Sequence, residues 1–317
     1  MTQIEYKTGP QAANHPSPAP GRLLIFGLGY TGTAIARLAL SRGWEVIATS
    51  RDPARLDPPR GTRLIAFADA GRHLDGVTHV LETAAPDAGG DPALAQHGPT
   101  LVAATLVAAG SIGWAGMLST TGVYGDRGGG WVDEDADPAP TGPRGARRLE
   151  AETEWRTAFA RCAVDLFRVA GIYGPGRSPF AEIRSGRARR VDKPGHCFGR
   201  IHRDDIAEAV LAAMAQARPA GARVLNLNDD EPVESADATA EAARLIGLPA
   251  PPLVPFAQAL ETMSEMGRSF WAENRKVASR KTQTALGLSW RYPTYRDGLR
   301  AILEQERAEH AAQQSEV

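Results

Sequence analysis

The chain has 317 residues, of which 43% are hydrophobic and 23% are charged, and its formal net charge is −1. This composition is that of an ordinary globular protein, and the balanced charge argues against a protein whose main partner is the phosphate backbone of a nucleic acid. We therefore expect a small-molecule ligand and no nucleic acid.

The first residues mix Pro, Ala, Asn and Ser without apolar periodicity, which predicts a disordered tail over 1–20. This segment lacks the apolar core of a signal peptide, and the sequence has no apolar run of about eighteen residues that could span a bilayer. The two cysteines, Cys162 and Cys197, lack the spacing of a metal or redox pair. We therefore expect no membrane partner and a cytoplasmic location.

From residue 22 onward, short β-rich runs alternate with helical segments. Strands are predicted over 23–26, 44–50, 62–67, 78–83, 115–120 and 163–169, and helices over 33–43, 99–110, 146–160 and 205–217. Such alternation predicts an α/β fold, a Rossmann-type doubly wound parallel sheet with helices on both faces. We expect an NAD(P)-binding Rossmann domain over 21–170. Turn-rich segments then predict a smaller C-terminal α/β cap on the substrate side, over 171–317, interleaved with the end of the sheet.

The loop after the first predicted strand reads GLGYTG, a GxGxxG motif that opens the first helix. In this context Gly27 makes the tight turn, Gly29 lets the backbone approach a pyrophosphate, and Gly32 permits close packing of the helix on the strand. Tyr30 and Thr31 lie at the helix N-terminus, where free N–H groups and the helix dipole bind phosphate. The motif therefore predicts a dinucleotide site.

The end of the second predicted strand decides the choice of cofactor, because NAD-binding proteins place an acidic residue there on the ribose hydroxyls. In this chain Ser50 and Arg51 occupy the strand end. A guanidinium beside a small hydroxyl side chain suits a 2′-phosphate. Asp52 follows directly and would take the NAD role if the strand ended one residue later. These residues favour NADP, with NAD as the less favoured alternative.

Two further loops belong to the same predicted site, because the carboxyl ends of parallel strands meet at one edge of the sheet. Asp69 follows the third predicted strand, where such folds contact the adenine, although it could equally form a turn with Ala70 and Gly71. Ala84 and Ala85 follow the fourth strand. We expect Asp69 on the first loop, and Ala84 and Ala85 on the second, to bind the cofactor.

Four motifs occur in the order found in a known family: GLGYTG, LSTTGVYGD at 118–126, FRVAGIYGPGRSP at 167–179 and RIHRDDIAEAV at 200–210. Through them the chain resembles, over residues 22–230, the extended and atypical short-chain dehydrogenase/reductases. This family includes NAD(P)-dependent epimerases, dehydratases and reductases. The segment SFWAENRKVASRKTQTALGLSWRYPTYRDGL is similar to the end of an atypical, YeeZ-like bacterial subgroup.

The resemblance implies that a Ser or Thr after the fifth strand holds the substrate oxygen and that a Tyr-x-x-x-Lys pair transfers a proton. It places Thr120 at the hydroxyl position, with Ser119 and Thr121 as alternatives. Arg144 and Arg148 occupy the tyrosine and lysine positions. Because arginine stays protonated, Arg144 cannot be the proton donor.

The origin of the proton is therefore open between three explanations. Tyr124 or Tyr173 could supply it, since each lies beside a glycine where a strand passes into a loop, although Tyr124 could equally be a packed aromatic. Solvent or the substrate could supply it instead. In the third explanation the protein binds the cofactor without turnover. In any of these cases Arg148, at the lysine position, could hold the nicotinamide ribose, repel a cation, or be a solvated charge beside Glu152.

On the substrate side, the resemblance places His202 near the cleft, either as an acid/base or as a structural hydrogen-bonding residue. Asp204 is the predicted N-cap of the next helix, and Asp205 is expected to tie the cap to the sheet. Arg177, in a Gly/Pro loop, would bind a substrate phosphate or carboxylate, or be an exposed loop residue. The acidic run 133–135 is predicted to be a solvated turn, and we assign no metal.

Together these features favour an NADP-dependent oxidoreductase or epimerase-like enzyme that acts on a small polar carbonyl or alcohol, sugar-derived ones included. The alternative is an NADP-binding sensor or regulatory protein without turnover, because the Tyr-x-x-x-Lys pair is absent. The sequence does not identify the substrate, and it leaves both a monomer and a homodimer open.

Overall fold

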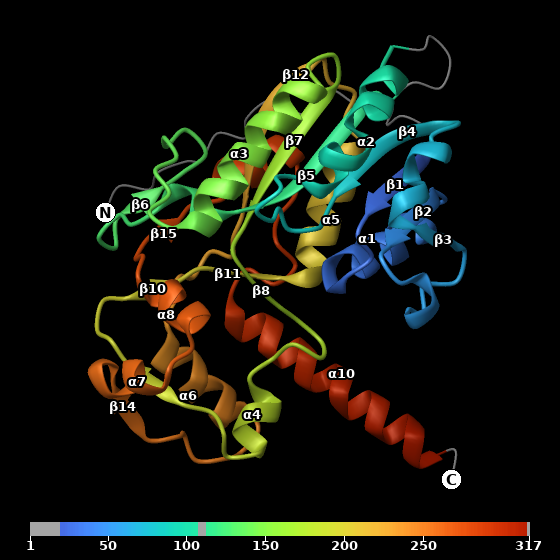
Figure 1. Ribbon diagram of the computed structural model, residues 1–317. Coiled ribbons are helices and arrows are strands. Elements are labelled where there is room, and N and C mark those ends of the chain that lie inside the picture. The colour runs from blue at the N-terminus through green and yellow to red at the C-terminus, as the bar shows by residue number, and fades with distance from the viewer. Residues whose placement is uncertain (1–19, 107–111, 316–317) are drawn as a thin grey trace, which may run out of the picture.

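A sheet of seven parallel strands forms the centre of the computed structural model, which describes residues 20–106 and 112–315 (Figure 1). The strand order is β12-β7-β5-β4-β1-β2-β3. It reverses between β1 and β4, as in a doubly wound Rossmann fold, so the predicted fold class is confirmed. The strands are β1 (Arg22–Phe26), β2 (Glu45–Ser50), β3 (Thr62–Ala66), β4 (Val77–Glu82), β5 (Trp114–Thr120), β7 (Ala163–Val169) and β12 (Gly221–Leu227).

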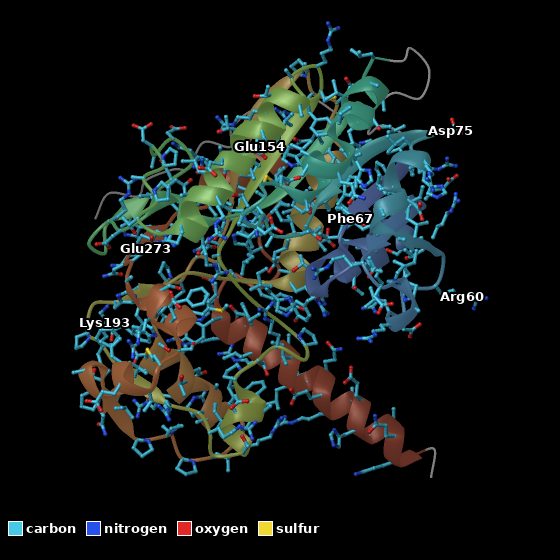
Figure 2. All side chains as sticks on the ribbon, in the orientation of Figure 1. Arg60, Phe67, Asp75, Glu154, Lys193 and Glu273 are labelled. Atoms are coloured by element: carbon cyan, nitrogen blue, oxygen red, sulfur yellow. The ribbon has the colours of Figure 1, made fainter. Side chains whose placement is uncertain are left out.

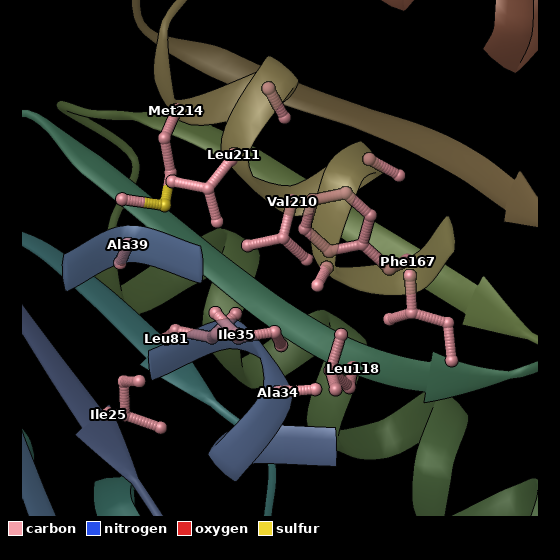
Figure 3. Close-up of a cluster of buried hydrophobic side chains, with 14 of the residues drawn as sticks. Ile25, Ala34, Ile35, Ala39, Leu81, Leu118, Phe167, Val210, Leu211 and Met214 are labelled. Carbon is pink, nitrogen blue, oxygen red and sulfur yellow. The ribbon is translucent and has the colours of Figure 1, made fainter. Parts of the chain in front are cut away.

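Helices cover both faces of this sheet. Helices α1 (Tyr30–Ser41) and α5 (Arg203–Met214) pack on one face, in the cluster drawn in Figure 3. Helices α2 (Pro92–Ala104) and α3 (Pro143–Ala158) contribute to the cluster on the other face. Successive strand side chains point to opposite faces, so burial on both sides explains why the strands read as continuous apolar runs.

The predicted helix over 99–110 begins earlier than expected. Helix α2 starts at Pro92, because Asp91 caps it by accepting a hydrogen bond from the Leu94 backbone nitrogen at 3.0 Å. Pro99 lies inside the helix rather than at its start. Residues 107–110 of the predicted helix, and the predicted tail apart from Pro20, lie outside the described residues.

The remaining elements form a smaller cap next to the sheet (Figure 1). Its helices are α4 (Phe180–Arg184), α6 (Ser235–Leu245), α7 (Phe256–Thr262), α8 (Glu265–Trp271) and α10 (Tyr295–Ser315). Short strand pairs accompany them: β8 (Gly171–Tyr173) with β11 (Arg200–His202), β9 (Arg190–Asp192) with β14 (Leu253–Pro255), and β10 (Cys197–Phe198) with β13 (Val233–Glu234). Although both follow residue 170, β12 is a strand of the main sheet and α5 packs on one face of that sheet.

One more strand pair joins the cap segment to the sheet domain. Strand β6 (Trp131–Val132) pairs in parallel with β15 (Lys276–Val277), and α9 (Arg280–Leu286) follows it. Three short 3-10 helices, η1 (Pro53–Arg55), η2 (Phe67–Arg72) and η3 (Thr121–Tyr124), follow β2, β3 and β5. Within the described ranges, no helix combines the length and the apolarity needed to cross a membrane.

Candidate cofactor and substrate site

The glycine loop between β1 and α1 has the shape of a phosphate cradle. Gly27 adopts a φ of +90°, and its backbone nitrogen donates to Thr49 Oγ1 at 3.0 Å. A Cβ on Gly32 would lie 2.5 Å from the Gly27 carbonyl oxygen, so only glycine allows α1 to pack this closely. A Cβ on Gly29 would meet no atom within 4 Å and would extend into open space.

The start of α1 adds hydrogen-bond donors to this open space. Gly29 is the N-cap and provides no side-chain oxygen, and the first turn, beginning with Tyr30 and Thr31, holds no acidic residue. Backbone N–H groups of a first helical turn have no partner within the helix. Uncapped donors, the positive end of the helix dipole and the space above Gly29 together fit a diphosphate.

The end of β4 lies directly against the cradle. Thr83 Oγ1 donates to the Gly27 carbonyl oxygen at 2.7 Å. The Ala84 backbone nitrogen would lie 3.4 Å from a Cβ on Gly27. Ala84 is half-buried and Ala85 is exposed. The structure thus brings Ala84 to the glycine loop, as expected of a residue that lines the cofactor site.

At the end of β2, the two candidates for cofactor selection differ in their partners. Asp52 forms an ion pair with Arg55 at 2.9 Å, and its backbone nitrogen donates to Ser50 Oγ at 3.1 Å. Arg51 is exposed and has no hydrogen-bond or ion-pair partner among the described residues. The carboxylate is therefore engaged locally, whereas the Arg51 guanidinium is free.

Asp69 lies in η2, the short helix that starts at Phe67, which Figure 2 labels. Its carboxylate accepts a hydrogen bond from Arg72 at 2.8 Å, three residues further on. This contact corresponds to the local alternative, in which Asp69 stabilises the turn. The side chain is 43% exposed and keeps one face open to solvent.

Thr120 is the least buried of the three hydroxyl candidates after β5. Ser119 and Thr121 are 5% and 8% exposed, whereas Thr120 is half-buried. Thr120 Oγ1 accepts from the Gly122 backbone nitrogen at 3.1 Å and so caps η3. Ser119 Oγ instead donates to the buried Glu152 carboxylate at 2.5 Å. Of the three, Thr120 is therefore the best placed to meet a substrate.

Arg148 is fixed to the ends of two strands. Its Nη1 donates to the carbonyl oxygens of Leu118 at 2.7 Å and Ala84 at 3.3 Å. The alternative of a solvated charge beside Glu152 is wrong, because Glu152 binds the buried Arg168 guanidinium through both carboxylate oxygens. Arg148 thus lies beside the cofactor loop, held by main-chain oxygens.

The packing contradicts a proton-donor role for Tyr124. The side chain is fully buried, and its hydroxyl donates to Asn226 Oδ1 at 2.8 Å. The Arg168 guanidinium lies over its ring, 4.7 Å from the centroid. Burial also raises the pKa of Tyr124 above its ordinary value. Tyr124 is therefore the packed aromatic of the alternative interpretation.

Tyr173 is similarly enclosed, which contradicts both its proposed proton transfer and its assignment as a substrate contact. It is 8% exposed, and its hydroxyl would lie 2.1 Å from a Cβ on Gly298 of α10. Its ring packs edge-on against His202, with the centroids 5.2 Å apart. Burial raises the pKa of Tyr173 far above its ordinary value.

His202, not Asp204, is the N-cap of α5. Its Nδ1 accepts from the Asp204 backbone nitrogen at 3.2 Å, so the predicted cap was wrong by two positions. The ring is 1% exposed, and burial lowers the pKa of His202 to about 4. Asp205 accepts hydrogen bonds from the backbone nitrogens of Arg291 and Tyr292. His202 is therefore neutral and structural rather than a substrate contact, and Asp205 ties the cap to the sheet.

The loop that contains Arg177 lies on Tyr30 of the cofactor loop. The Tyr30 hydroxyl donates to the Pro175 carbonyl oxygen at 3.0 Å. The guanidinium groups of Arg177 and Arg203 lie over its ring, 5.6 Å and 4.7 Å from the centroid. Arg203 was not predicted to belong to the site, although it follows His202 directly in the RIHRDD motif. Two cations thus lie near the start of α1.

The acidic run 133–135 forms the predicted exposed turn, in which the Asp135 backbone nitrogen donates to Asp133 Oδ1 at 3.0 Å and the Asp135 side chain is 82% exposed. Lys281 pairs with Asp133 at 2.7 Å and with Asp135 at 2.5 Å. Glu134 accepts a hydrogen bond from the Thr282 backbone nitrogen at 3.1 Å. These carboxylates attach their loop to the start of α9.

The fold and the glycine cradle define a Rossmann-type nucleotide-binding protein. No family model matches the sequence. A solved protein of unknown function from Silicibacter pomeroyi is 44% identical, with a TM-score of 0.82, over 90% of this chain and 99% of its own. The chain belongs to the same family as this Silicibacter pomeroyi protein.

More distant proteins share parts of this likeness. Protein YeeZ of Escherichia coli is 27% identical over 65% of this chain and 77% of its own. A 3-diazoavenalumate denitrifying reductase from a Streptomyces species is 29% identical over 53% of this chain, and the match spans 58% of that reductase.

Two further solved structures share the fold at lower identity. MoeE5 in complex with UDP-glucuronic acid and NAD is 22% identical, with a TM-score of 0.71, over 91% of this chain and 100% of its own. Human epimerase family protein SDR39U1 with NADPH is 19% identical, with a TM-score of 0.67, over 89% of this chain and 99% of its own.

Proposed function

We propose that the protein is an NADP-dependent oxidoreductase or epimerase-like enzyme that acts on a small polar carbonyl or alcohol, sugar-derived ones included. The observation that carries this proposal is the cradle at Gly29, where uncapped helix amides face a space that a single Cβ would enter. A diphosphate matches both the donors and the dipole at this position.

A nicotinamide cofactor is supported by the solved neighbours, of which MoeE5 is described with NAD and SDR39U1 with NADPH. The preference for NADP rests on the end of β2. Arg51 is free to bind a 2′-phosphate, while Asp52 is paired with Arg55 and so is less available to ribose hydroxyls. When bound, the nicotinamide exchanges a hydride with the substrate.

On the substrate side, Thr120 is the group that would hold the reacting oxygen by a hydrogen bond. Arg148, bound to the Leu118 and Ala84 carbonyl oxygens, keeps the ends of β5 and β4 in a fixed relation. Because Tyr124 and Tyr173 are enclosed, the proton that accompanies hydride transfer comes from solvent or from the substrate itself.

The cofactor preference is tested by titrating the purified protein with NADPH and NADH and following cofactor fluorescence. Arg51→Asp should weaken NADPH binding by at least about tenfold, because hydrogen bonds to a charged group are lost, and should change NADH binding much less. Arg60→Asp is the matched control, since it changes the charge equally at another exposed arginine. An equal loss for both nucleotides would contradict the preference for NADP.

A second candidate function is a sensor that binds NADP without turnover. The enclosure of Tyr124 favours it, because the family's proton donor has no evident replacement. Oxidation of NADPH over a panel of carbonyl compounds separates the two. Thr120→Val should abolish turnover at unchanged cofactor affinity if the protein is an enzyme. Tight binding without turnover of any compound would favour the sensor.

A further inference from the structure

The first turn of α3 presents a cation where the resemblance places a tyrosine. Arg144 is exposed, and among the described residues it has neither a hydrogen-bond nor an ion-pair partner. Arg148 follows one helical turn later, on the same side of the helix. Burial lowers the pKa of Arg148, Glu82 and Asp91 raise it, and the charge of Arg144 lowers it by a smaller amount. Arg148 thus has acidic neighbours, whereas Arg144 has no ion-pair partner among the described residues.

Helix α8 of the cap faces this turn with apolar side chains. The Arg144 guanidinium carbon lies 5.4 Å from the centroid of the Phe270 ring. Phe270 is 56% exposed, and Met266, one turn earlier, is 61% exposed. Residues four positions apart share one side of a helix, so both side chains extend the apolar surface beside Arg144.

The segment after α8 is anchored to the loops around Thr120. Glu273, labelled in Figure 2, accepts hydrogen bonds from Thr141 Oγ1 at 2.5 Å and from Arg275 Nη1 at 2.6 Å. Arg275 Nη1 also donates to the Gly125 carbonyl oxygen at 3.0 Å. Glu273 therefore compensates Arg275, and Arg144 remains without a counterion.

The geometry of Arg144 suits an oxyanion on a flat apolar molecule. The Arg144 guanidinium lies over the Phe270 ring and its N–H donors have no partner among the described residues, so they are free for bidentate binding of a carboxylate or phosphate. The adjoining Phe270 and Met266 side chains offer area for an aromatic or unsaturated body.

We infer that the substrate carries a carboxylate or phosphate group, bound by Arg144, on a flat apolar body that packs against Phe270 and Met266. This inference rests on the proposed function, because it assigns the substrate class of the same site. Arg144 then orients the substrate from the position where the resemblance places a proton-donating tyrosine. Arg148 stays bound to main-chain oxygens and does not contact the anion.

The test measures binding of benzoate, phenyl phosphate and neutral benzamide to the NADP-bound protein by calorimetry, at up to millimolar concentrations. A prior NADPH titration reports separately on the proposed function. We expect at least one anion to bind about tenfold more tightly than benzamide, as hydrogen bonds to a charged group predict. The tighter anion identifies the group that the site prefers.

Variants then assign the preference to its residue. Arg144→Gln should abolish the preference for the anion and leave NADPH affinity unchanged, whereas Arg147→Gln, which removes the same charge from the same helix, should preserve it. Phe270→Ser should weaken benzoate and benzamide alike. Equal binding of anion and amide, absence of binding by any probe, or an unchanged preference in Arg144→Gln would overturn the inference.

Discussion

Two alanine substitutions in the glycine loop should have opposite consequences, and the contrast tests the cradle. In Gly29→Ala the new Cβ meets no protein atom within 4 Å, and the backbone φ of −87° suits alanine. A weaker N-cap and a less flexible unfolded chain offset one another, so the free energy of unfolding should change by less than about 1 kcal/mol. The methyl group occupies the phosphate space, however. Losing one or two amide–phosphate hydrogen bonds should weaken NADPH binding by about 10- to 100-fold.

In Gly32→Ala the new Cβ would lie 2.5 Å from the Gly27 carbonyl oxygen, so α1 must move away from β1. Such overpacking costs about 1–3 kcal/mol, or roughly 2–4 °C of Tm for each kcal/mol in a domain of this size. Thermal unfolding and NADPH fluorescence titration of both variants provide the comparison. Wild-type NADPH affinity in Gly29→Ala would refute the placement of the diphosphate. Equal destabilisation of both variants would refute the steric argument.

Glu152→Ala should lower the free energy of unfolding in urea by about 3–5 kcal/mol, because it leaves the buried Arg168 guanidinium without a counterion. The double variant Glu152→Leu, Arg168→Met replaces both charges by apolar side chains and should lose less stability. If the losses in unfolding free energy of Glu152→Leu and Arg168→Met, each made alone, add up to the loss of the double variant, the two side chains are not coupled. Burial raises the pKa of Asp229 from an ordinary 3.8 to about 8, so the folded carboxyl keeps a proton that the unfolded one releases. The free energy of unfolding should fall as pH rises from about 4 to 8, by up to about 1.4 kcal/mol per pH unit. Asp229→Asn should flatten this slope in urea midpoints, and an unchanged slope would assign it to other groups. Gly145→Val should lower Tm, since a Cβ would lie 2.8 Å from the Gly122 carbonyl oxygen, and a wild-type Tm would show that α3 moves freely.

The main sheet was predictable to the extent that its strands carry local signals. The strands from β1 to β7 that build the main sheet read as apolar runs, because helices bury both faces. Strand β12 was missed because it begins with the small, exposed residues Gly221 and Ala222, and only its parallel pairing with β7 defines it. The N-cap of α5 was misassigned because His202 and Asp204 can both cap a helix, and only the backbone geometry selects between them.

In the candidate site too, some features follow from the local sequence and others only from contacts between distant segments. The glycine loop and the free Arg51 lie within one βαβ unit, where spacing along the chain dictates spacing in the fold. The enclosure of Tyr124 depends on Asn226 and Arg168, which lie on other strands. Nothing near Tyr124 in the sequence distinguishes a buried ring from an active-site hydroxyl.

By itself, the sequence determined the α/β class, six of the seven strands of the parallel sheet and the phosphate loop, because short-range periodicity and backbone sterics fix these features. Only the tertiary structure decided which side chains have partners, since that depends on contacts between segments far apart in the chain. It placed Arg144 of α3 over Phe270 of α8 and left that guanidinium without a counterion among the described residues, whereas Arg275 is paired with Glu273.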